Sequence, residues 1–126
     1  MDYAPHHWHL ICSDLEEMVR FFTDVLGGKL TGRRAIRGAD AAMIDLAGTA
    51  IWLRTAEPGE QPDAGPTRRH FGYDHLGLSV CNLQQAYQEL TAKGCEFIVP
   101  PAGPDARIAF LRGPDNIGIE LFQPPS

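Results

Sequence analysis

The chain has 126 residues, 44% of them hydrophobic, and this length fits one compact domain with a sizeable core. Its formal net charge of −5 argues against a nucleic-acid partner, because phosphate backbones are bound by clustered positive charge. The first residues lack a basic and apolar leader pattern and no apolar run could cross a bilayer, so we expect a cytoplasmic protein without a membrane partner. Cys12, Cys81 and Cys95 lack CxxC spacing and fall in apolar stretches, which favours reduced core thiols over a disulfide framework.

The first half of the chain predicts one strand, one helix and then three strands. A short aromatic and apolar strand covers residues 7–12. Asp14 is then a suitable N-cap, with Glu17 at capping-box spacing. Apolar side chains recur at steps of three and four up to Leu26, and Gly27-Gly28 ends the helix. The three following strands are predicted over 29–37, 41–46 and 49–55.

The second half repeats this order after a linker. Residues 57–72 contain three prolines and no periodicity, which indicates a linker too short to separate independent domains. Asn82 caps a second helix that Gly94 closes. The strands of this half are predicted over 74–80, 95–99, 107–111 and 117–122. We therefore predict a single domain over 1–126, with module one at about 5–56 and module two at 73–123.

A constant sequence offset relates the two halves. His7 and His75 lie 68 residues apart, and each stands seven residues before the capping residue of its helix. The same offset relates Leu53 to Leu121 and Trp52 to Glu120. A period of this length is too long for a solenoid, and it indicates duplicated halves packed about a pseudo-twofold axis.

The repeat points to an open metal site. A lone strand histidine more often bonds the backbone than a metal, but His7 and His75 occupy equivalent positions of both halves. Glu120 stands between two apolar residues on the last strand, where an ionised carboxylate is costly unless a positive charge meets it. Two histidines and one carboxylate form the ligand set of an open metal site.

Other side chains on the same strands are candidates for catalysis or substrate binding. His9 shares the face of His7, and could act as an acid or base or simply bond a backbone carbonyl. His6 has the opposite parity and is expected to point away. Trp52 is a cavity wall or a core indole. Arg54 could hold a substrate carboxylate or phenolate, although a solvated arginine is the commoner case. Further apolar walls are expected from Trp8 and Phe110.

Residues 6–30, 74–97 and 113–124 resemble the vicinal oxygen chelate superfamily, which includes glyoxalase I, extradiol dioxygenases, fosfomycin-resistance enzymes and bleomycin-binding proteins. The resemblance covers essentially the whole chain and implies an α+β fold. In that family two tandem βαβββ modules form an eight-stranded, incompletely closed barrel with helices outside and the metal in its concavity. His7, His75 and Glu120 fall on three of the family's ligand positions.

Trp52 departs from the family pattern. Glyoxalases and epimerases of the family place a Glu, Gln or His there, and an indole replaces neither a fourth ligand nor a base. Three protein ligands instead resemble the extradiol dioxygenases and the fosfomycin-resistance enzymes. We expect a dioxygenase-like metalloenzyme that binds a small substrate through vicinal oxygens. Fe(II) or Mn(II) is favoured and Zn or Ni is possible.

Three alternatives stay open at this point. They are a glyoxalase-type lyase or isomerase, a fosfomycin-type thiol transferase, and a metal-free drug-binding protein of the bleomycin-resistance kind. The resemblance also implies a homodimer, because family members commonly pair, and the metal site could then lie within one chain or be shared.

Overall fold

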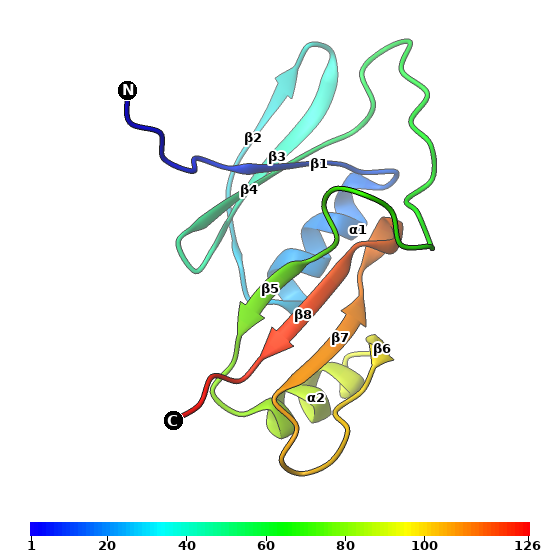
Figure 1. The fold of residues 1–126 in the computed structure, drawn as a ribbon. Helices are drawn as coiled ribbons and strands as arrows, with labels where there is room; N and C mark the ends of the chain where they lie inside the picture. Colours follow the sequence, from blue (N-terminus) through cyan, green and yellow to red (C-terminus); the bar gives the residue numbers. More distant parts are fainter. The chain divides into compact units, whose positions relative to one another are not determined.

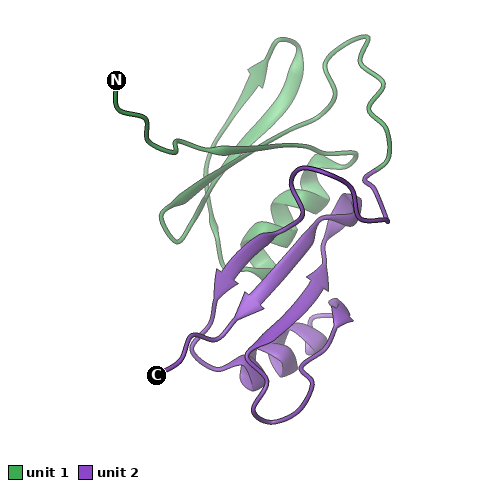
Figure 2. Ribbon diagram, viewed as in Figure 1, with its two compact units in different colours: residues 1–64 green, residues 65–126 purple.

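The structure is a computed structural model that describes residues 1–126, and it contains the two βαβββ modules expected of the α+β fold (Figure 1). The chain divides into two compact units, residues 1–64 and 65–126 (Figure 2). The boundary between them lies inside the predicted linker. We refer to the two units as module one and module two and describe each by itself.

Module one is a four-stranded sheet with one helical segment. Its strands run in the order β1-β4-β3-β2, with β1 parallel to β4 and the other pairs antiparallel. The predicted order of elements is confirmed, with bounds shifted by one or two residues. The elements are β1 (Trp8–Ile11), α1 (Leu15–Arg20), the π-helix η1 (Phe21–Val25), β2 (Lys29–Ile36), β3 (Ala39–Leu46) and β4 (Thr49–Arg54).

The first helix begins as predicted but changes its winding halfway. The Asp14 side chain accepts a hydrogen bond from the Glu17 N–H at 3.0 Å, which caps α1. From Phe21 to Val25 the helix is π-helical, whereas the periodicity predicts a regular α-helix to its end. The Thr23 hydroxyl donates to the Val19 carbonyl at 2.8 Å and so competes with the backbone for that acceptor.

The helical segment covers one face of the sheet of module one. Met18 and Phe22 are fully buried, and so are Ile44, Ile51 and Leu53 of the strands that α1 contacts. Gly28 allows this close approach, because a Cβ there would lie 2.8 Å from the Phe22 carbonyl oxygen and 2.9 Å from a methyl carbon of Ile44. The opposite face of the sheet is therefore left to the candidate site residues.

Module two repeats the arrangement. Its strands run in the order β5-β8-β7-β6, with β5 parallel to β8, and its core includes Leu83 of the helix and Leu111 and Ile119 of the strands. The elements are β5 (Leu76–Ser79), α2 (Leu83–Ala92), β6 (Glu96–Val99), β7 (Ile108–Arg112), the short 3-10 helix η2 (Pro114–Asn116) and β8 (Gly118–Phe122).

None of the three cysteines forms a disulfide, and only one is a core thiol. Cys12 is buried, Cys95 is half-buried and Cys81 is exposed. The prediction of a core position is wrong for Cys81, because this residue follows β5 in the turn that leads to the cap of α2. No helix in the structure has both the length and the apolar character needed to span a membrane.

Replacing Asn82 by Ala should lower the free energy of unfolding by about 1 kcal/mol. The Asn82 side chain accepts the Gln85 N–H at 3.0 Å, and without it this N–H at the start of α2 loses its partner. Urea denaturation checks this expectation. Asn82→Ser keeps an oxygen acceptor at the cap and should recover most of the loss; an Ala variant as stable as the parent would contradict the capping role.

Candidate functional site

The candidate ligands of module two lie next to each other. His75 precedes β5, and Glu120 lies on β8 directly opposite Gly77 of β5 and Phe110 of β7. The Nε2 atom of His75 is 3.8 Å from Oε2 of Glu120, and both side chains are about a quarter exposed. At this separation the two atoms are beyond hydrogen-bond distance. Neither atom is therefore engaged in a hydrogen bond by the other.

Asp74 orients His75. Its Oδ2 lies 2.7 Å from Nδ1 of His75, and this hydrogen bond holds the pKa of the Asp74 carboxyl below its usual range. An ionised carboxylate only accepts, so Nδ1 of His75 is the donor in this hydrogen bond, and in the Nδ1–H tautomer the lone pair of Nε2 lies on the side of Glu120. Asp74 is not among the site residues predicted above, although the adjacent Asp-His pair is visible in the sequence.

Small and aromatic residues lie beside His75 and Glu120 in module two. The Phe110 ring meets the His75 ring edge to face, with centroids 5.0 Å apart. A Cβ at Gly77 would lie 3.5 Å from Oε1 of Glu120, and one at Gly118 would lie 3.4 Å from Cβ of His75. Glycine at both positions leaves the carboxylate and the imidazole accessible.

In module one an aromatic cluster centres on Trp52. Trp52 lies opposite His9 on β1 and Met43 on β3, the same place in its sheet that Glu120 has between Gly77 and Phe110. The His7 ring stacks on the indole, with centroids 3.6 Å apart and planes 11° apart. The His9 ring meets it edge to face at 6.3 Å. The structure thus brings His7, His9 and Trp52 together on one face.

The expectation that His6 points away is wrong. Its Nδ1 lies 3.0 Å from Nδ1 of His7, and its ring centroid is 5.7 Å from that of Trp52. The alternation of side chains holds only within a strand, and β1 begins at Trp8. Trp8 itself pairs with the buried Ile51 and so lies on the other face of the sheet from Trp52. The expectation that Trp8 forms an apolar wall together with Trp52 is therefore wrong.

The surroundings of His9 favour the neutral form of its imidazole. Partial burial lowers the pKa of its imidazole, and the charges of Arg54, His7 and Arg37 lower it further. A neutral imidazole on this face can accept a proton from a substrate hydroxyl.

Arg54 is buried and already neutralised. The residue is 7% exposed. Its guanidinium donates to Glu60 Oε1 at 2.7 Å and to the Thr55 carbonyl at 3.0 Å, and it lies 3.6 Å from a carboxylate oxygen of Glu57. The expectation of a solvated arginine is therefore wrong. The chain that follows β4 turns back and supplies both carboxylates, a tertiary contact that no strand pattern reveals.

The Arg54 contacts predict a pH-dependent contribution to stability. The hydrogen bond from Arg54 lowers the pKa of Glu60 below its unfolded value near 4.3, so its contribution is present above that pH and is lost as the pH falls through the folded value. Glu60→Gln should therefore lower the urea midpoint at pH 7 and change it much less at pH 3. Asp63→Asn in the same segment should have little effect at either pH. An equal loss for Glu60→Gln at both values would contradict the ionic contribution.

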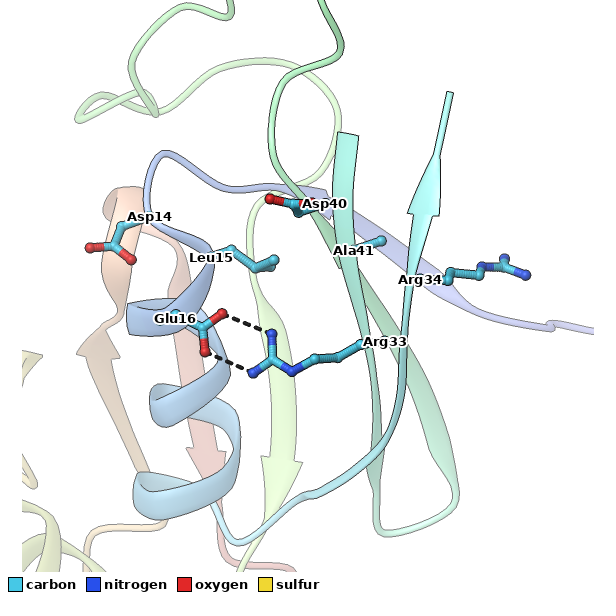
Figure 3. A pocket seen from close by; sticks show the side chains of 7 residues that line it. All are labelled: Asp14, Leu15, Glu16, Arg33, Arg34, Asp40 and Ala41. Carbon is cyan, nitrogen blue, oxygen red and sulfur yellow. Dashed lines mark hydrogen bonds and ion pairs between the residues drawn. The ribbon is translucent and has the colours of Figure 1, made fainter. Parts of the chain in front are cut away.

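An open pocket of about 440 Å³ in module one is lined by none of the site residues predicted from the sequence (Figure 3). Two of its charged lining residues neutralise each other, because Arg33 donates two hydrogen bonds to Glu16 at 2.7 and 2.8 Å. Within either module, no three His, Cys, Asp or Glu side chains gather at metal-binding distance. Module two thus supplies a pair of candidate ligands, and module one supplies His7.

Known proteins resemble this chain over nearly its whole length. The uncharacterized protein YwkD of Bacillus subtilis (strain 168) is 30% identical over 124 residues, which are 94% of either chain. The crystal structure of a glyoxylase/bleomycin resistance protein/dioxygenase domain from Frankia sp. EAN1pec is 27% identical, with a TM-score of 0.78, and the match covers 99% of this chain and 100% of that one.

The fold is also that of FosX, a fosfomycin resistance protein. The structure of the Listeria monocytogenes protein with Mn(II) and sulfate has a TM-score of 0.73 at 16% identity, and the match covers 99% of this chain and 95% of that one. Residues 4–121 match the family described as the Glyoxalase/Bleomycin resistance protein/Dioxygenase superfamily. The chain therefore belongs to this superfamily, also known as the vicinal oxygen chelate superfamily.

Proposed function

We propose that the protein is a cytoplasmic, divalent-metal-dependent enzyme that binds a small substrate through two vicinal oxygens. His75 and Glu120 of module two would hold the metal together with His7. The arrangement of Asp74, His75 and Glu120 carries this proposal, because the imidazole has its Nδ1 engaged at 2.7 Å and its Nε2 directed at a carboxylate 3.8 Å away.

The donor atoms fit a divalent ion. Metal bonds to imidazole nitrogen and carboxylate oxygen are about 2.0–2.2 Å long, so two donors that share an ion lie roughly 3–3.5 Å apart. A small side-chain rotation closes the His75–Glu120 distance to that range. A mixed set of imidazole and carboxylate suits Fe(II) or Mn(II), while Zn or Ni is also compatible with it. When bound, the ion would act as a Lewis acid toward the substrate oxygens and, as Fe(II), could support reaction with dioxygen.

The other residues have distinct proposed roles. His9, whose lowered pKa favours the neutral imidazole, would accept the proton of a substrate hydroxyl. Trp52 and Phe110 would border the substrate with apolar surface. The Glu60 carboxylate already occupies Arg54, so a substrate anion would have to displace it.

The proposed reaction is a dioxygenase-like ring cleavage of a dihydroxyaromatic compound. Both atoms of dioxygen enter the ring-opened product beside the two oxygens of the substrate, and dioxygen is the oxidant of the cleaved carbon–carbon bond, so no separate reductant is needed. The test combines metal analysis of protein purified without chelator with oxygen uptake on catechols. We expect about one Fe or Mn per site and oxygen consumption equal to substrate loss. Tight metal binding without oxygen uptake would exclude the dioxygenase, and no metal, with unchanged stability after Fe(II) or Mn(II) is added, would favour a drug-binding protein.

A second candidate is fosfomycin-type chemistry. Its support is the fold shared with FosX, for which a structure with Mn(II) and 1S,2S-dihydroxypropylphosphonic acid exists. Metal-dependent loss of an epoxide phosphonate without oxygen consumption would select this candidate, with or without an added thiol.

We further propose a homodimer, in keeping with the family resemblance. Light scattering should then give about twice the mass of 13.9 kDa.

Asp74→Asn should weaken metal binding about 10- to 100-fold. The amide can donate to Nδ1 of His75, which would move the imidazole hydrogen to Nε2 and remove the lone pair offered to the metal. Isothermal titration of metal-free protein with Mn(II) measures the affinity, and ¹⁵N shifts of the imidazole report the tautomer. Asp105→Asn should change neither quantity. An Asp74→Asn variant with the Nδ1–H tautomer and parent affinity would contradict the orienting role.

A further inference from the structure

One cationic side chain on the site face of module one has no acidic partner. Arg33 is paired with Glu16, Arg37 with Glu57 and Arg54 with Glu60. Arg34 forms no ion pair, and its guanidinium carbon lies 5.0 Å from the centroid of the Trp52 ring. Of these four arginines, Arg34 is therefore the one whose positive charge is not neutralised, and it lies beside Trp52.

Strand geometry explains how Arg34 reaches Trp52. Arg33 and Arg34 point to opposite faces of β2, and Figure 3 shows the Arg34 side chain directed away from the Arg33–Glu16 pair. Arg34 lies opposite Ala41 on β3, which in turn lies opposite Arg54 on β4. The small Ala41 side chain presents no obstacle, so the long Arg34 side chain crosses β3 toward the indole.

The contact with Trp52 positions the Arg34 guanidinium and leaves its N–H groups available as hydrogen-bond donors. A cation above an aromatic ring is attracted by the ring electrons, while the N–H groups lie in the guanidinium plane and stay free to donate. A planar fork of N–H donors matches a carboxylate with two parallel hydrogen bonds. The Trp52 indole and the neighbouring Met43 side chain offer apolar surface beside that fork.

We propose that Arg34 and Trp52 form a binding site for a planar aromatic carboxylate, with the carboxylate on the Arg34 guanidinium and the ring beside the indole. This inference deepens the proposed function, on which it rests for the choice of a dihydroxyaromatic substrate, because it names an anionic group on that substrate. It also moves the anion-binding role from the neutralised Arg54 to Arg34.

The experiment titrates metal-free protein with 3,4-dihydroxybenzoate and, separately, with catechol, and follows the indole N–H signals by NMR. The chain has two tryptophans, and Trp8→Phe assigns the signal of Trp52. The acid should shift the Trp52 signal and bind at least about tenfold more tightly than catechol. Arg34→Gln should remove this difference, Arg34→Lys should keep part of it, and Arg33→Gln on the opposite face should preserve it.

Several results would overturn the site. They are no shift of Trp52 by the acid, equal affinities of the acid and catechol for the parent protein, or an Arg34→Gln variant that still prefers the acid. The exposed position of Arg34 favours a folded variant, and the dispersion of the remaining NMR signals checks this directly. Because the titration uses no metal, loss of the carboxylate preference and failure of metal binding are separate results. The first contradicts the Arg34 site, and the second contradicts the metal-dependent function.

Discussion

Glu120→Gln should weaken divalent metal binding about 100-fold or more. The substitution keeps the size of the side chain but removes the one negative charge among the proposed ligands, and metal affinity depends on deprotonated, charged donors. Glu120 is only about a quarter exposed and lies 3.8 Å from His75. The carboxylate is therefore lost at the position where the proposed ion would be bound. Isothermal titration of the metal-free protein with Mn(II) at constant pH measures the loss.

A matched substitution on α2 separates a ligand effect from a general charge effect. Glu89→Gln removes the same charge from a side chain that interacts with Gln85 on its own helix. It should leave Mn(II) affinity within about twofold of the parent, because charges on an exposed helix face are screened. Equal losses for Glu89→Gln and Glu120→Gln would mean that Glu120 acts only through net charge and is not a ligand.

Phe22→Ala should lower the free energy of unfolding by about 3–5 kcal/mol. The Phe22 ring is 1% exposed, packs edge to face with Phe21 and belongs to the core between the helical segment and the sheet. The cavity left by the ring cannot easily be filled by a shift of the backbone. The π-helical turn at Phe22 already lies in close contact with Gly28, the residue before β2. Urea denaturation of the metal-free protein measures the change.

Phe71→Ala is the control for that substitution. Its ring is fully exposed in the segment before β5, so removal of the same group should change the stability by no more than about 0.5 kcal/mol. Comparable losses for the two variants would contradict the assignment of Phe22 to the core. Since domains of this size are stable by only about 5–15 kcal/mol, the loss at Phe22 is a large part of the total.

Local patterns in the sequence were sufficient to predict the helices and strands and the repetition of their order in the two modules. Asp14 and Asn82 cap their helices as their spacing predicts, and strand bounds agree to within a few residues. The offset that relates Trp52 to Glu120 is matched by their equivalent places in the two sheets. Capping and side-chain periodicity depend on residues a few positions apart, which is why sequence alone predicts them.

Contacts between distant segments could not be predicted in the same way. The burial of Arg54 depends on carboxylates that a later turn returns to it, and the free state of Arg34 depends on which neighbours are paired elsewhere. His6 joins the aromatic cluster because β1 starts after it, a boundary that periodicity does not resolve. Asp74 is the exception, since its adjacency to His75 was available in the sequence.

Anomalous diffraction at the metal edge, from crystals of the full chain loaded with Mn(II) or Fe(II), tests the central claim most directly. The ligand set predicted from the duplicated halves is His7, His75 and Glu120, contributed by one chain or by two copies, with further coordination positions open to substrate. One anomalous peak bonded to those three side chains is the expected result. A peak held without His7 or Glu120, or no peak after loading, would contradict the metal site and the function proposed from it.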